Sequence, residues 1–74
     1  MTLAELQHGS LSLIAAINSN GEACKRLNQL GVIPGAEARI LRAAPFGDPM
    51  QVRVDNTVLS IRKRDADQIQ VELV

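Results

Sequence analysis

The sequence predicts a small, mainly β protein: a five-stranded barrel with one short helix between the first and second strands. Two patterns predict it, namely short segments in which apolar and polar residues alternate, and a single segment with helical spacing of leucines. Closing the strands into a twisted barrel would remove most of their exposed edges. The 74 residues are expected to form one domain over 1–74, which buries only about 60% of the surface that its unfolded chain exposes.

The first strand is expected at Leu11–Ile17, the mostly apolar run LSLIAAI. A short helix should follow, because Ser19 and Glu22 have the spacing of a capping box, in which each residue satisfies a free N–H of the other's turn. These residues place the helix between the first and the second strand.

Ala23, Leu27 and Leu30 recur at i, i+4 and i+7 in this helix and are expected to be buried on one face. Gly31 is expected to end it, because glycine adopts the left-handed conformation of a helix C-terminus without strain. The helix has about three turns at most, so it needs docking to persist in water.

The remaining strands show alternation, with Met50, Val52 and Val54 as the clearest case. Asp55-Asn56 fits a two-residue hairpin, since both residues tolerate a positive φ. The polar segment KRDADQ predicts one turn of helix that carries Ala66 inward. The four strands are expected at residues 36–43, 50–54, 57–62 and 69–74.

Composition argues against several functions. Eight Lys or Arg balance eight Asp or Glu, so the basic excess typical of nucleic-acid binding is missing. An RNA-binding small barrel would also need aromatic residues for stacking, and this chain has one Phe and no Tyr or Trp. The longest apolar run is far too short to span a bilayer. We expect a soluble, cytoplasmic protein without membrane insertion or nucleic-acid partner.

The chain offers few residues for catalysis or metal binding. His8 and Cys24 are its only histidine and cysteine, and no spacing supplies the three or four ligands of a metal site. His8 is expected in a turn and Cys24 as a small core residue. Asp65 and Asp67 are expected as solvated charges or as partners for Arg62, Lys63 and Arg64. No nucleophile has an adjacent base. These absences predict a binding module with no enzymatic activity, no cofactor and no metal site.

The only aromatic residue, Phe46, lies in the turn-forming stretch APFGDPM. Pro45 and Pro49 should stiffen this loop and Gly47-Asp48 should form its turn. Phe46 then has two interpretations: it folds back over the barrel core, which would contribute about 2 kcal/mol, or it is held outward as a preorganised apolar anchor for a partner.

The order of these residues resembles the ferrous iron transport protein A (FeoA) family over nearly the whole chain. The resemblance rests on RLNQLGVIPG at 26–35, APFGDPM at 44–50 and LSIRKRDADQIQV at 59–71. It implies an SH3-like small barrel. One departure is the hairpin turn, which commonly contains glycine in such proteins and here is Asp55-Asn56.

The resemblance also implies a function: a cytoplasmic accessory protein of ferrous iron uptake that binds or regulates FeoB, a membrane transporter with a GTPase domain, without carrying iron itself. The candidate partner-binding residues are Phe46, Gly47, Asp48, Pro49 and Arg62. The alternative is a regulatory protein- or peptide-binding SH3-like module related to the C-terminal domain of iron-dependent repressors. Such repressors usually join the barrel to a DNA-binding domain, which these residues do not contain.

Two further expectations concern contacts. Arg62 ends the fourth strand, and its guanidinium is expected either to satisfy loop carbonyls or a carboxylate such as Asp65, or to contact the partner. The last strand, IQVELV at 69–74, is apolar enough to pair with a copy of itself. We therefore expect weak self-association through that edge.

Overall fold

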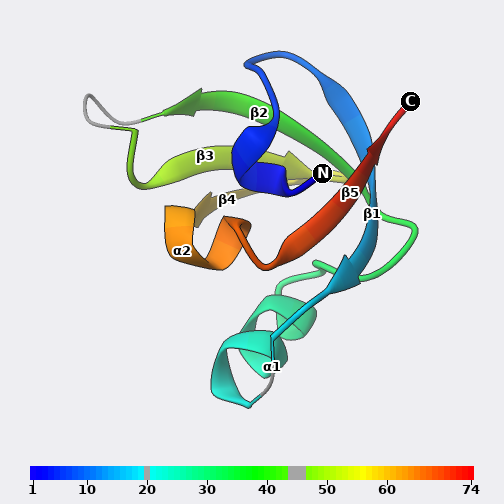
Figure 1. The fold of residues 1–74 in the computed structure, drawn as a ribbon, viewed down its shortest axis with the longest axis vertical. Coiled ribbons are helices and arrows are strands. Elements are labelled where there is room, and N and C mark those ends of the chain that lie inside the picture. The colour runs from blue at the N-terminus through cyan, green and yellow to red at the C-terminus, as the bar shows by residue number, and fades with distance from the viewer. Residues whose placement is uncertain (20, 44–46) are drawn as a thin grey trace.

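The computed structural model describes residues 1–19, 21–43 and 47–74. Five antiparallel strands form one sheet in the order β4-β3-β2-β1-β5, and this sheet coils strongly upon itself (Figure 1). The predicted mainly β architecture, with one short helix between the first and second strands, is confirmed. The elements are η1 (Leu3–Glu5), β1 (Leu11–Ile17), α1 (Glu22–Gln29), β2 (Glu37–Ala43), β3 (Met50–Val54), β4 (Thr57–Ile61), α2 (Lys63–Ala66) and β5 (Ile69–Leu73).

The core lies inside the coiled sheet and is built largely by alternation along the strands, which is interrupted by bulges in β1 and β2 and by the exposed Leu73 in β5. In β3, for example, Met50, Val52 and Val54 are buried while the residues between them are exposed, as the sequence predicted. The turn of helix α2 places Ala66 in the core with no exposed surface, which is also confirmed. The helix η1 contacts β5 and α2, so these short helices fill the side of the barrel where β4 and β5 do not pair.

The hairpin between β3 and β4 has the predicted two-residue turn, with Val54 and Thr57 as its last paired residues. Asp55 adopts a φ of 51°, a left-handed conformation that aspartate tolerates better than most residues. Its carboxylate Oδ1 also accepts a hydrogen bond from the Glu37 N–H at 3.1 Å. The missing glycine of the family pattern is therefore replaced by an aspartate that ties the turn to β2.

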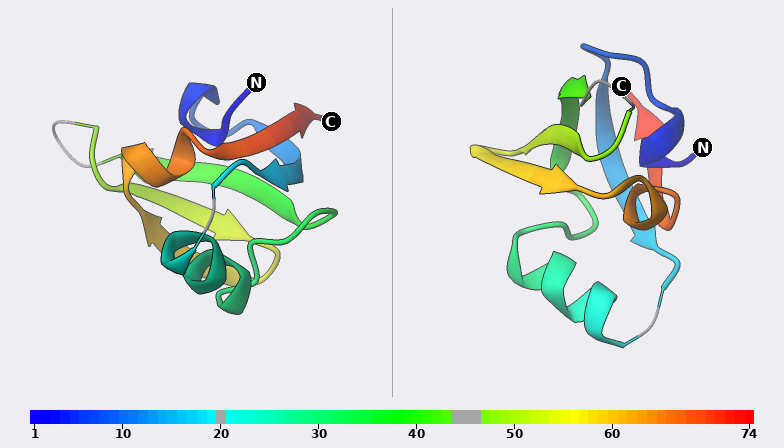
Figure 2. Two further views of the ribbon diagram at one scale, coloured as in Figure 1. Left: turned by 60° about the horizontal axis from the view of Figure 1, so that its bottom comes forward. Right: turned by 90° about the vertical axis from the view of Figure 1, so that its left-hand side faces the viewer.

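Helix α1 projects from the end of the barrel where β1 finishes (Figures 1 and 2). It ends as predicted: Gly31 has a φ of 97°, and its N–H bonds the Asn28 carbonyl while the Val32 N–H bonds the Leu27 carbonyl. These two bonds form a Schellman motif, whose hydrophobic contact joins the buried Leu27 and Val32.

Three expectations for α1 are wrong. The helix begins after Gly21, whose φ of 77° turns the chain, and no side chain caps it; Ser19 lies too far upstream to act in a capping box. Leu30 is 44% exposed, because the helix projects from the barrel and docks mainly through Leu27. Cys24, expected in the core, is only partly buried.

The two edges of the sheet differ. The outer side of β5 is partly covered by the N-terminal residues, since Thr2 bridges Gln70 and the Val71 N–H donates to the Met1 carbonyl at 2.9 Å. The free edge expected along the whole of 69–74 is thus reduced to its last residues, with Leu73 61% exposed. Self-pairing along the full length of this strand is blocked by the chain's own N-terminus.

Candidate functional site

Three of the five predicted partner-binding residues meet at one place on the surface. Asp48 and Pro49, from the loop before β3, and Arg62, which precedes α2, line a hollow of about 220 Å³. Segments far apart in the sequence thus bring these three side chains together. Gly47 lines a neighbouring hollow, while Phe46 lies outside the described residues.

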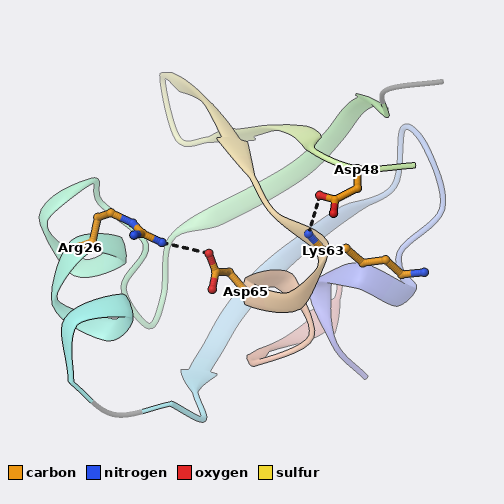
Figure 3. Close-up of polar contacts among 4 residues, drawn as sticks. All are labelled: Arg26, Asp48, Lys63 and Asp65. Atoms are coloured by element: carbon orange, nitrogen blue, oxygen red, sulfur yellow. Dashed lines mark hydrogen bonds and ion pairs between the residues drawn. The ribbon is translucent and has the colours of Figure 1, made fainter. Parts of the chain in front are cut away.

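Asp48 has a structural role within this site. Its carboxylate Oδ1 accepts a hydrogen bond at 3.0 Å from the N–H of Lys63, the first residue of α2 (Figure 3). The first N–H groups of a helix have no partner inside the helix, so an acceptor there stabilises the helix. Asp48 therefore fixes the start of α2 against the loop. This contact also positions Arg62, which is the single residue between β4 and α2.

Asp65, one of the acceptors expected for Arg62, pairs with a different arginine. The carboxylate of Asp65 instead forms an ion pair with Arg26 of α1 at 3.0 Å (Figure 3). Arg26 reaches it from the projecting helix, so this carboxylate ties α1 to α2. Arg62 is exposed and lines the hollow with Asp48 and Pro49.

The neighbouring hollow, of about 270 Å³, is lined mostly by apolar residues. Gly47 lies at this hollow with His8, whose ring Nε2 is hydrogen-bonded with the Leu41 carbonyl oxygen. His8 lies in a turn, as predicted. The complete lining is Ala4, Leu6, His8, Ile40, Gly47, Met50 and Lys63. The contribution of the N-terminal residues was missed, because nothing in their sequence indicates which strand they pack beside.

A third hollow, of about 250 Å³, lies on the outer face of the sheet and was not predicted. Its charged residues are Glu37 and Arg39 of β2 with Arg53 and Asp55 at the end of β3. These hollows are smaller than the 300–1,000 Å³ typical of small-molecule pockets.

Within the ranges 1–19, 21–43 and 47–74, no group of three or more His, Cys, Asp or Glu side chains is placed to hold a metal ion. Cys24 contacts Asn28 of its own helix, at 3.7 Å between Nδ2 and Sγ. In the same ranges no helix is long and apolar enough to cross a bilayer.

A coiled five-stranded antiparallel sheet with short helices at the side where β4 and β5 do not pair defines the class of small β-barrel domains. Its residues 1–73 match the model of the FeoA domain, and the chain belongs to that family. The resemblance in the sequence is thereby confirmed.

Two solved structures are similar to this chain over the whole fold. The iron(II) transport protein A of Clostridium thermocellum is 38% identical, with a TM-score of 0.95, over 100% of this chain and 46% of its own. The FeoA of Stenotrophomonas maltophilia, described as a procaryotic SH3 domain protein and solved with zinc, is 29% identical with a TM-score of 0.85 over 97% and 89% of the two chains. The SH3-like fold is confirmed.

A curated relative links the family to a transporter. A fusion protein of Fe(2+) transport protein A with the Fe(2+) transporter FeoB, from Porphyromonas gingivalis, is 32% identical over all 74 residues. The chain spans only 9% of that fusion protein. The family to which the chain belongs therefore takes part in ferrous iron transport.

The predicted relation to metal-dependent repressors holds at the level of fold. The manganese regulator SloR is 23% identical with a TM-score of 0.84, and this chain covers 34% of it. The likeness shows a shared barrel.

Proposed function

We propose that this chain is a cytoplasmic accessory module of ferrous iron uptake that docks on a FeoB-type transporter, without catalytic activity and without carrying iron itself. The observation that supports it most is the fusion of a 32% identical relative to FeoB in one polypeptide. In a fusion protein the linker keeps the two domains close together, at a high effective concentration. A chain that is not linked to the transporter needs a docking surface to bind it.

The docking surface proposed is the hollow of Asp48, Pro49 and Arg62, together with the adjoining Gly47 and Phe46. Pro49 and the hydrogen bond that the Lys63 N–H donates to Asp48 hold the hollow's walls in place before binding, which lowers the entropic cost of association. Arg62 offers planar bidentate donors for a carboxylate of the partner.

The test measures binding to the isolated cytoplasmic GTPase domain of the cognate FeoB. We expect Arg62→Ala to weaken binding by 10-fold or more while the fold is kept, since truncating an arginine at the centre of an interface commonly costs about 2 kcal/mol. Lys25→Ala removes the same charge from the exposed side of α1 and should leave binding unchanged.

Arg62→Lys separates the two expected roles of this residue. If the guanidinium holds the loop, the substitution lowers the melting temperature more than it changes affinity. An unchanged melting temperature with lost transporter binding assigns Arg62 to the partner contact. Equal binding by wild type, Arg62→Ala and Lys25→Ala would contradict docking at this hollow, and no binding by any of them would contradict the proposed partner.

A further inference from the structure

The outer face of the sheet carries four charges in two rows of like sign. Arg39 of β2 lies directly opposite Arg53 of β3. One pleat further, Glu37 lies beside Asp55: the Asp55 N–H donates to the Glu37 carbonyl, and the Glu37 N–H donates to the Asp55 carboxylate. Like charges that face each other across two strands destabilise a sheet, so each of these two pairs is unfavourable in a monomer.

These charges are not neutralised within the part of the chain that the structure describes. Arg39 donates from Nη1 to the Gly9 carbonyl, and Arg53 donates from Nε to the Asp55 carbonyl, each at 3.1 Å. In that part of the chain the only ion pair is that of Arg26 with Asp65. Each guanidinium has five N–H donors, so both arginines keep donors directed toward the hollow.

The two rows are complementary to each other under a two-fold rotation. Consider a two-fold axis that lies between the two rows and runs across the strands. A second copy generated by this axis packs face to face on the first, with its acidic row over the arginine row of the first copy. Glu37 of each copy then faces Arg39 of the other, and Asp55 faces Arg53. This is the isologous contact of a symmetric dimer, in which each pair occurs twice.

The apolar residues that flank the rows obey the same rotation. Leu11 is the β1 partner of Arg39, and Leu13 is the β1 partner of Glu37. The rotation that matches the charges therefore sets Leu11 of one copy over Leu13 of the other. Leu13 is 39% exposed, so this contact would remove apolar surface from water.

We propose that this face, formed by Leu11, Leu13, Glu37, Arg39, Arg53 and Asp55, binds a second copy of the chain in a weak symmetric dimer. A stable interface buries about 800 Å² per partner, a sixth of the 4676 Å² of this chain. A patch of six residues is smaller, and exposed ion pairs contribute little each. The dimer therefore forms only at high protein concentration and dissociates in salt.

The dimer face lies at the hairpin end of β3, whereas Asp48 and Pro49 precede the opposite end of that strand. Self-association thus leaves the proposed transporter site uncovered. The two proposals stand independently, and a dimer would present two transporter sites.

The experiment follows sedimentation velocity and amide NMR spectra of the chain up to about 1 mM at low ionic strength, then in about 0.5 M salt, where charges are screened beyond a few ångströms. We expect concentration-dependent dimerisation, lost in salt, with shifts concentrated at Leu11, Leu13, Glu37, Arg39 and Arg53. A monomer under all conditions would overturn the proposal.

Charge variants identify the surface. Arg39→Glu with Arg53→Glu makes the face acidic, while Glu37→Arg with Asp55→Asn makes it basic and keeps a residue that tolerates the positive φ. Each variant alone should be monomeric, and an equimolar mixture should dimerise again. Lys25→Glu with Arg64→Glu changes the net charge by as much as the acidic variant does, but away from this face. This control should dimerise like the wild type.

Dimers that persist in both face variants, or shifts that map to the exposed edge of β4 instead, would refute this face. If an acidic-face variant fails to fold, Arg39→Gln with Arg53→Gln replaces it, and the salt dependence and shift map of the wild type decide the question without any substitution.

Discussion

The hydrogen bond from Lys63 to Asp48 should contribute measurably to stability. Asp48→Ala removes the acceptor that α2 has at its first N–H, and loss of such a capping acceptor costs about 1 kcal/mol. For 74 residues, at about 2.1 cal/mol/K each, the entropy of unfolding is about 155 cal/mol/K, so the melting temperature should fall by about 6 °C.

Thermal unfolding followed by circular dichroism measures this fall. Asp48→Asn is the matched control, because its side-chain oxygen still accepts the Lys63 N–H, and it should lose less than half as much. An unchanged melting temperature in Asp48→Ala, or equal falls in the two variants, would refute the assignment of Asp48 as the residue that fixes the start of α2.

Three other outcomes are expected. Phe46→Ala should abolish binding to the GTPase domain with the melting temperature nearly unchanged; a large fall in stability with binding retained would make the ring a core residue instead. The Thr2 N–H donates to Glu5 at 2.7 Å and lowers the pKa of that carboxyl below its usual 4.5. The stabilisation from this hydrogen bond is therefore present at pH values above the pKa of Glu5 in the unfolded chain. It is lost as the pH falls through the lowered pKa of Glu5 in the folded protein. Glu5→Gln should remove this loss of stability at low pH. The measurement is the hydrogen exchange rate of the Val71 amide, which donates to the Met1 carbonyl, as a function of pH. Identical pH profiles for the wild type and the variant would contradict this prediction. Calorimetry should show no tight stoichiometric Fe(II) binding by the isolated chain, and a one-to-one site in the low micromolar range would disprove this.

The strands could be predicted because their signal is local. A period of two, as at Met50, Val52 and Val54, places alternate side chains on one face wherever the strand pairs, and these residues are buried. Gly31 could be predicted for the same reason, since a left-handed residue after a helix requires little knowledge of the rest of the chain.

Helix α1 shows where local patterns fail. Ser19 and Glu22 have capping-box spacing, but the position of the helix start depends on how the chain leaves β1, and Gly21 makes that turn. Leu30 continues the apolar stripe, yet burial needs a surface to pack on, and a projecting helix has one only near Leu27. Val32, beyond the helix, is fully buried instead.

The contacts around the candidate site could not be predicted from the sequence. Asp48 and Lys63, which form a hydrogen bond there, are 15 residues apart, and Arg26 and Asp65, which join α1 to α2, are 39 residues apart. The charged rows of the outer face depend on the β2–β3 register, which a bulge shifts between Ile40 and Arg42. No pattern in the sequence indicates that shift.

The position of β1 between β2 and β5 has a consequence for synthesis. β1 pairs Ile17 with Ile69 and Ser12 with Leu73, so a strand made early finds one of its two partners only near residue 73. While the ribosome still holds β5, the nascent barrel leaves one side of β1 and much of its core uncovered. The barrel therefore folds cooperatively and late, after the last strand has emerged, and its rate should be limited by closing this long loop.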